Sequence, residues 1–164
     1  MEIERKFWIK KSDAFTFKRM SIIVQHYINK PSDYYEIRLR NYVSENRYYL
    51  EFKSKGNLIR EEFGTKLTEE QYNNILNGVN KNDIFSIRKK RYYLNEDGVF
   101  YDRYMDKLEG LETLEVEGDN NYVKNYTLKY PWNLEAIEVT NDDRFKNRNL
   151  SMVTYDDIIK KFNY

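Results

Sequence analysis

The feature that most constrains how this chain can fold is an alternation of charge at its N-terminus. Glu2, Glu4 and Lys6 occupy every second position of the first six residues. Successive side chains of a β-strand point to opposite faces, so these three would share one face of a strand. Two carboxylates and an ammonium group make a poor core but a good site, because carboxylates bind hard divalent cations and lysine binds anions. For an isolated motif of this length, a solvent-facing strand is the simpler explanation.

The same alternation recurs along the chain, and this recurrence changes the interpretation. If the sheet closes into a barrel, one face of every strand points into the lumen. A lumen lined by both signs of charge would suit a polyanion bridged by a divalent cation. The recurring charges are Glu36, Arg38 and Arg40, then Glu51 and Lys53, Arg60 and Glu62, Lys89 and Arg91, Asp102, and finally Glu115 and Glu117.

Length and composition set the outer bounds. The chain has 164 residues, 34% of them charged, a formal net charge of +1 and no cysteine. We therefore expect one domain over residues 1–164, with neither thiolate metal sites nor an overall field that attracts nucleic acid or membranes. The N-terminus is charged where a signal peptide would be apolar, and no apolar run approaches the ~20 residues of a membrane span. These features predict a cytoplasmic protein.

Periodicity predicts many strands and few helices. A capping-box pair, Thr68 and Gln71, precedes a helical stripe that reaches Val79. A second helix is expected after Thr154, where apolar residues again recur at helical spacing. The predicted strands span 1–9, 21–29, 34–43, 47–54, 58–64, 84–94, 99–106, 111–118 and 134–140.

The order of these motifs resembles the CYTH superfamily of triphosphate tunnel metalloenzymes, which an N-terminal Glu-x-Glu-x-Lys defines. The resemblance runs almost from end to end. Eight further segments are similar to family motifs, in family order: 25–28, 37–40, 50–54, 58–62, 89–92, 101–102, 110–117 and 137–147.

This resemblance implies an α+β fold, with an eight-stranded antiparallel closed β-barrel that forms a tunnel and carries flanking helices. It also implies hydrolysis of triphosphates with Mg²⁺ or Mn²⁺. The acidic, metal-side residues would be Glu2, Glu4, Glu62, Asp102, Glu115 and Glu117. The phosphate side would consist of Lys6, Arg38, Arg40, Lys53, Arg60, Lys89 and Arg91.

The residues expected to take part in catalysis are drawn from both sides of the tunnel. Tyr27 matches a tyrosine proposed as proton acceptor in single-domain bacterial members, but a phenol with a pKa near ~10 is mostly protonated at neutral pH. We therefore expect water to be the nucleophile, oriented by Glu115 or Glu117. The full catalytic set is Tyr27, Lys6, Arg38, Arg40, Glu115 and Glu117.

Two departures from the family pattern affect this expectation. Gly64 stands where the family often has a further glutamate, so one lumen carboxylate is missing. Glu51 stands where a threonine is common. If Glu51 points inward, it either compensates for Gly64 or pairs with an arginine, and the sequence leaves both alternatives open.

Two other functions fit the same residues. Class IV adenylate cyclases share the implied fold and metal dependence, and a non-catalytic polyphosphate-binding module would need only the basic residues. Retention of both Glu-x-Glu pairs favours the hydrolase over the binding module, because carboxylates repel a polyphosphate when no metal is present. The segment 25–28 resembles the single-domain hydrolase branch more than the cyclases. The expected partner is a small-molecule triphosphate, with no nucleic acid and no membrane, and the protein is expected to be a monomer or a homodimer.

Overall fold

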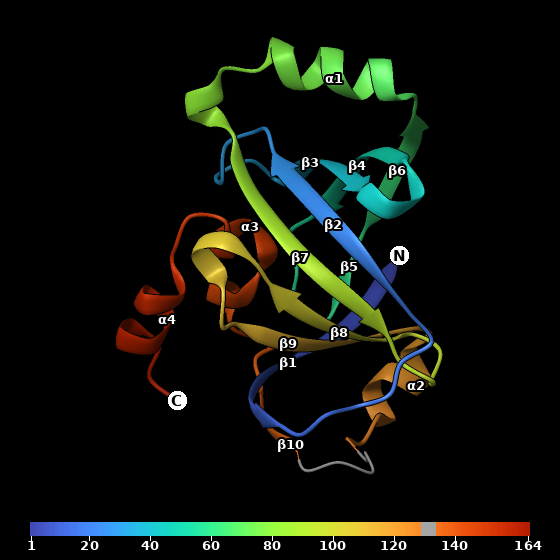
Figure 1. Cartoon of the computed structure of the whole chain (residues 1–164), viewed down its shortest axis with the longest axis vertical. Helices are drawn as coiled ribbons and strands as arrows, with labels where there is room; N and C mark the ends of the chain where they lie inside the picture. The colour runs from blue at the N-terminus through green and yellow to red at the C-terminus, as the bar shows by residue number, and fades with distance from the viewer. Residues whose placement is uncertain (129–133) are drawn as a thin grey trace.

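Ten antiparallel strands form a nearly closed barrel in the computed structural model of the chain, which describes residues 1–128 and 134–164 (Figure 1). Neighbouring strands follow the order β10-β1-β9-β8-β7-β2-β3-β4-β6, and β5 pairs with β1. The strands are β1 (Glu2–Ser12), β2 (Arg19–Tyr27), β3 (Tyr35–Tyr42), β4 (Arg47–Ser54), β5 (Ile59–Arg60), β6 (Glu62–Leu67), β7 (Phe85–Tyr93), β8 (Val99–Tyr104), β9 (Glu112–Glu117) and β10 (Leu134–Glu138).

The short strand β5 joins the two ends of this sheet. Arg60 pairs with Glu2 and Ile59 pairs with Ile3, so the segment that leads into β6 also touches the start of β1. The prediction of a closed antiparallel barrel is confirmed, but the predicted count of eight strands is wrong. Pairing is interrupted at Glu61, where the chain leaves β1 and joins β4, and β10 pairs with the second half of β1.

Four α-helices flank the barrel in the described part of the chain (Figure 1). The two predicted helices are confirmed, and Thr68 and Thr154 cap them with complete capping boxes. Two short helices were not predicted, because single turns rich in asparagine carry a weak helical signal. The helices are α1 (Glu69–Gly78), α2 (Asn120–Asn125), α3 (Asn147–Leu150) and α4 (Tyr155–Lys161), with 3-10 turns η1 (Val43–Glu45), η2 (Lys81–Asp83), η3 (Asp106–Leu108) and η4 (Asp143–Phe145).

The apolar core lies mainly outside the charged face of the barrel. Leu39, between Arg38 and Arg40 on β3, is fully buried in a cluster with Tyr48 and Tyr72 of α1. The strand therefore points its leucine outward and its arginines inward, as the alternation predicts. Crossing a bilayer needs a longer and more apolar helix than any among the described residues.

One end of the lumen is filled by apolar side chains. Trp8 continues the face of Lys6 on β1, and Tyr27 lies opposite Arg38 on the inward face. Both are buried in a cluster with Phe145, Leu150 and Ile158 of the C-terminal segment, which comprises η4, α3 and α4. The C-terminal segment therefore closes this end of the barrel and brings its own polar side chains to the charged cavity.

Candidate functional site

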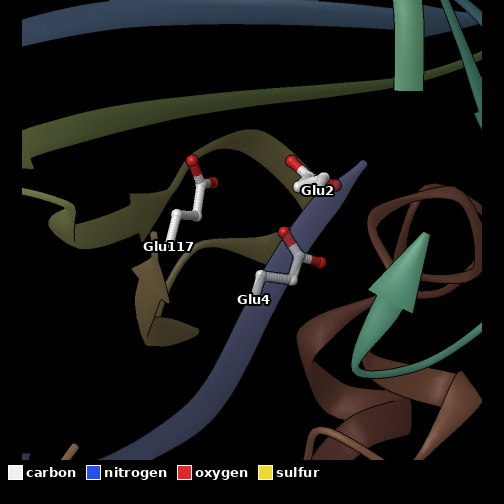
Figure 2. Close-up of side chains that lie close together, drawn as sticks. All are labelled: Glu2, Glu4 and Glu117. Atoms are coloured by element: carbon white, nitrogen blue, oxygen red, sulfur yellow. The ribbon is translucent and has the colours of Figure 1, made fainter. Parts of the chain in front are cut away.

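Three carboxylates converge on one point of the lumen. Glu2 and Glu4 come from β1 and Glu117 from the end of β9, and Glu4 lies directly opposite Glu117 in the sheet register. One oxygen of each carboxylate lies within 4.8 Å of the others, and Figure 2 shows the three groups turned toward a common space. Oxygen donors at this spacing match the ligands of a hard divalent cation.

The pKa values of Glu117 and Glu2 reflect their burial and the charges around them. Burial raises the pKa of Glu117 to about 7, and the charges of Glu4 and Glu2 add to that shift against the opposing charge of Arg91. Burial also raises the pKa of Glu2, although Lys53 acts in the opposite direction. These carboxylates are held together by the strands at an electrostatic cost, which a bound cation would relieve.

Lys53 connects the carboxylates to the basic side of the lumen. Its Nζ lies 2.6 Å from Glu2 Oε2 and 3.4 Å from Glu4 Oε2. Burial alone would lower the pKa of Lys53, but the charges of Glu4 and Glu2 raise it above its ordinary value. The ammonium group therefore stands beside the place where the carboxylates would hold a cation.

Arg38 and Arg40 form ion pairs with glutamates of the neighbouring strands. Arg38 lies 3.3 Å from Glu51 Oε1 and 3.3 Å from Glu62 Oε1, while Arg40 Nε lies 3.7 Å from Glu51 Oε1. Arg40 Nε is buried without a hydrogen-bond partner among the described residues. Glu51 thus points inward and pairs with the two arginines.

The lack of a side chain at Gly64 leaves room for Glu51 to point into the lumen. The two residues are directly opposite in the pairing of β4 with β6. A Cβ atom at position 64 would press on the carbonyl oxygen of Leu50 and lie 3.0 Å from Glu51 Cα. The glycine at position 64 and the inward glutamate at position 51 are therefore linked by local packing.

A second ion-pair network lies deeper, on β7, β8 and β9. Asp102 is fully buried, with Lys89 Nζ 2.7 Å from Oδ2 and Arg91 donating to both oxygens at 2.8 Å. Glu115 accepts from Arg91 and pairs with Lys6 at 3.2 Å. The charges of Lys89, Arg91 and Lys6 hold the pKa of Glu115 well below its usual range, although burial opposes them.

This network separates the predicted metal-side residues into two groups. Glu2, Glu4 and Glu117 converge, whereas Asp102 and Glu115 have oxygens engaged by lysine and arginine, and Glu62 pairs with Arg38. Lys89 is fully buried among these charges, and burial together with Arg91 lowers its pKa to about 8. The metal roles of Glu62, Asp102 and Glu115 stay predictions.

A cavity runs from the basic residues toward the C-terminal segment. Its open space is small, about 30 Å³, against roughly 300–1,000 Å³ in typical small-molecule sites. Internal ion pairs fill the rest, including Arg60 with Glu36 at 3.0 Å. An anionic ligand would therefore have to replace some of these pairs. The walls include Glu4, Lys6, Tyr27, Glu36, Arg38, Lys53, Arg60, Thr140, Asp142, Lys146 and Asn147.

Tyr27 lies at the apolar end of this cavity. It is buried, its hydroxyl accepts a hydrogen bond from Gln25 Nε2 at 3.2 Å, and burial raises its pKa. A raised pKa means that even less phenolate is present at neutral pH than for an exposed tyrosine, so less of the residue is available to accept a proton. The structure thus gives no support to a proton-acceptor role for Tyr27.

Three residues of the site were missed in the sequence. Tyr104 lies two residues after Asp102 on β8 and shares its inward face, so strand alternation could have predicted that it faces the lumen. Glu36 begins the alternation of β3 but was not assigned a role. Asn147 follows a turn and begins α3, where no strand pattern indicates which way a side chain points.

No protein-family model matches the chain. The inorganic triphosphatase of Nitrosomonas europaea is 29% identical over 154 residues, which cover 92% of this chain and 97% of the relative. A crystal structure of an inorganic triphosphatase superposes with a TM-score of 0.61 at 26% identity, over 93% of this chain and 95% of the other.

A more distant structure has the same fold. A Hippeastrum protein, a candidate adenylyl cyclase with a dominant triphosphatase activity, gives a TM-score of 0.53 at 13% identity over 76% of this chain and 83% of its own. The barrel fold implied by the sequence motifs is thus found in solved structures. Along nearly its whole length the chain is similar to an inorganic triphosphatase.

Proposed function

We propose that this protein is a divalent-metal-dependent triphosphatase, which hydrolyses the terminal phosphoanhydride of inorganic triphosphate or of an organic triphosphate inside its barrel. The observation that carries the proposal is the two-signed cavity, where converging carboxylates adjoin buried lysines and arginines. The similarity to an inorganic triphosphatase over 92% of the chain supports the same reaction.

The residues present fit a hard cation. Glu2, Glu4 and Glu117 offer three carboxylate oxygens within 4.8 Å of one another, a donor set suited to Mg²⁺ or Mn²⁺. Burial raises the pKa of Glu117, and the charges of Glu4 and Glu2 add to that shift against the opposing charge of Arg91, so a bound cation would relieve part of this repulsion. When bound, the cation would neutralise phosphate charge and make water in the cavity more acidic.

The basic residues would hold the triphosphate. Lys6, Arg38, Lys53 and Arg60 line the cavity, and the buried Nε of Arg40 has a free donor. Guanidinium groups make bidentate contacts with phosphate oxygens and neutralise charge that develops during phosphoryl transfer. Lys89 and Arg91 are bound to Asp102, so their contribution would be mainly to the field of the cavity.

Water would attack the terminal phosphorus while the bond from that phosphorus to the bridging oxygen breaks. The products are orthophosphate and the substrate shortened by one phosphate. Of the two carboxylates expected to orient that water, Glu117 is better suited than Glu115. Glu115 already accepts from Arg91 and pairs with Lys6, whereas Glu117 has, among residues 1–128 and 134–164, only the distant contact with Arg91 at 4.0 Å.

Phosphate release tests the proposal. We would supply tripolyphosphate, thiamine triphosphate, ATP and GTP, each with Mg²⁺ or Mn²⁺, and expect orthophosphate from at least one. Cyclic AMP and pyrophosphate from ATP would instead identify a cyclase, and binding without turnover would identify a polyphosphate-binding module.

Glu4→Gln provides the matched test of the carboxylate cluster. It should reduce turnover by at least about 100-fold, since it removes a proposed metal ligand, while the melting temperature in chelating buffer stays the same or rises because repulsion is relieved. The control is Glu112→Gln on the outer face of β9, where the side chain accepts from Tyr101 and Arg103. Native turnover by Glu4→Gln would overturn the assignment.

A further inference from the structure

The ammonium group of Lys6 makes two hydrogen bonds and one ion pair, with residues from three different elements. Its Nζ lies 3.1 Å from Asn147 Oδ1, 3.3 Å from the Tyr104 hydroxyl and 3.2 Å from Glu115 Oε1. An ammonium group has three donors, and two of them are engaged in these hydrogen bonds. Lys6 is also a wall residue of the cavity.

Asn147 is the centre of this arrangement. Its Oδ1 accepts from Lys6 and also from the Tyr104 hydroxyl, at 2.6 Å. Both lone pairs of the amide oxygen are thereby used, and the tyrosine oxygen is left free to accept from Lys6. The amide nitrogen in that position would face an ammonium group with its own hydrogens, so only the oxygen fits.

The polypeptide holds Asn147 firmly in this place. It is the first residue of α3, and the buried side chains of Phe145 and Leu150 anchor the segment on either side of it. Tyr104 is also buried and packs in the same apolar cluster. The amide group therefore reaches Lys6 from a rigid support outside the barrel wall.

We propose that Asn147 is a positioning residue, which aims the Lys6 ammonium group at the phosphate-binding cavity. Asn147 and Lys6 both line the cavity, whereas Glu115, the cross-strand partner of Lys6, does not. Without Asn147, the charge of Glu115 would draw the ammonium group toward β9 and away from a bound phosphate. The inference rests on the proposed triphosphate site and adds a residue from the C-terminal segment to it.

A double-mutant cycle tests this role. We would measure the Kd of tripolyphosphate by calorimetry in the presence of Ca²⁺, with turnover shown to be absent, for the native protein, Asn147→Ala, Lys6→Met and the double variant. Asn147→Ala should weaken binding about tenfold in the native background, the size expected for a hydrogen bond to a charged group. In the Lys6→Met background the same change should have at most about a twofold effect.

The control is Asn149→Ala, which removes the same side chain from the same helix. Asn149 donates to the backbone carbonyl of Asp143 and does not reach Lys6, so native affinity is expected. Tyr104→Phe is a second variant that removes the hydroxyl and keeps the buried ring, and it should also weaken binding only when Lys6 is present. It keeps the test valid if Asn147→Ala does not fold.

Equal losses in the two backgrounds would overturn the inference, because they would mean that Asn147 acts on the fold and not through Lys6. Native affinity in Asn147→Ala would overturn it as well. If the native protein itself neither binds nor hydrolyses tripolyphosphate, the proposed function fails instead, and the two failures are therefore distinguishable.

Discussion

Glu117 is a carboxylate that should titrate near neutral pH. Its pKa is raised from 4.5 to about 7, first by burial and then by the charges of Glu4 and Glu2. The folded protein therefore binds this proton more tightly than the unfolded chain. Loss of this proton should therefore lower the free energy of unfolding as pH rises from about 4.5 to about 7 in metal-free buffer.

Cation binding should show the opposite pH dependence. A carboxylate must be ionised to bind a metal, so the affinity for Mn²⁺ should rise between about pH 6 and about pH 8, by up to about tenfold per unit below the pKa. Calorimetric titration at the two pH values measures this change. Glu117→Gln should flatten it, and Glu112→Gln should keep it. An unchanged pH dependence in Glu117→Gln would mean that another group is responsible.

Asp102 shows what sequence can and cannot predict for one residue. Strand alternation correctly predicts that it shares the charged face with Glu115 and the basic residues. It does not predict that Arg91 and Lys89 occupy both of its oxygens, because that depends on the rotamers of side chains on a neighbouring strand. The hydrogen bond between Lys6 and Asn147 could not be predicted for the same reason.

At the scale of the element, β3 should separate activity from stability within three residues. Arg38→Ala should lower kcat/KM by about 10²–10³-fold, since it removes a guanidinium group aimed at the phosphate. Leu39→Ala should cost about 2–5 kcal/mol in the free energy of unfolding, because the leucine is fully buried against Tyr48 and Tyr72. Phosphate release and denaturant unfolding measure the two effects.

The matched control for this pair is Arg88→Ala on β7. Its side chain is 46% exposed and pairs with Asp106, outside the lumen. A loss of activity as large as that of Arg38→Ala, at similar stability, would contradict the inward assignment of β3.

On β6, Gly64 should resist replacement by any residue with a side chain. Even Gly64→Ala would press its Cβ on the backbone of β4, next to Glu51. We expect a loss of about 1–3 kcal/mol in the free energy of unfolding, as for other overpacked sites. Chemical denaturation compares this variant with Gly78→Ala, where the new Cβ would meet no atom within 4 Å. Equal stability of the two variants would contradict the packing argument.

For the whole molecule, charge alternation predicted strands with one charged face, and the resemblance of the motifs to a known family implied that these strands close into a barrel. All nine predicted strands are present, because period-two patterning survives even where the buried face is polar. The break at Glu61 and the pairing of β5 with β1 were not predictable, since both depend on how far the sheet curls before its ends meet. The sequence likewise did not predict that the C-terminal segment forms part of the cavity wall, because its position depends on tertiary contacts of Phe145 and Leu150.

The most direct measurement asks whether the carboxylates and the basic residues share one cavity. Calorimetry would compare the affinity for tripolyphosphate with and without Ca²⁺, and the affinity for Ca²⁺ with and without tripolyphosphate, after correction for their complex in solution and with turnover shown to be absent. A shared cavity predicts that each ligand strengthens the other by the same factor, about 5–150-fold. Independent binding, with affinities that do not change, would contradict a single two-signed site.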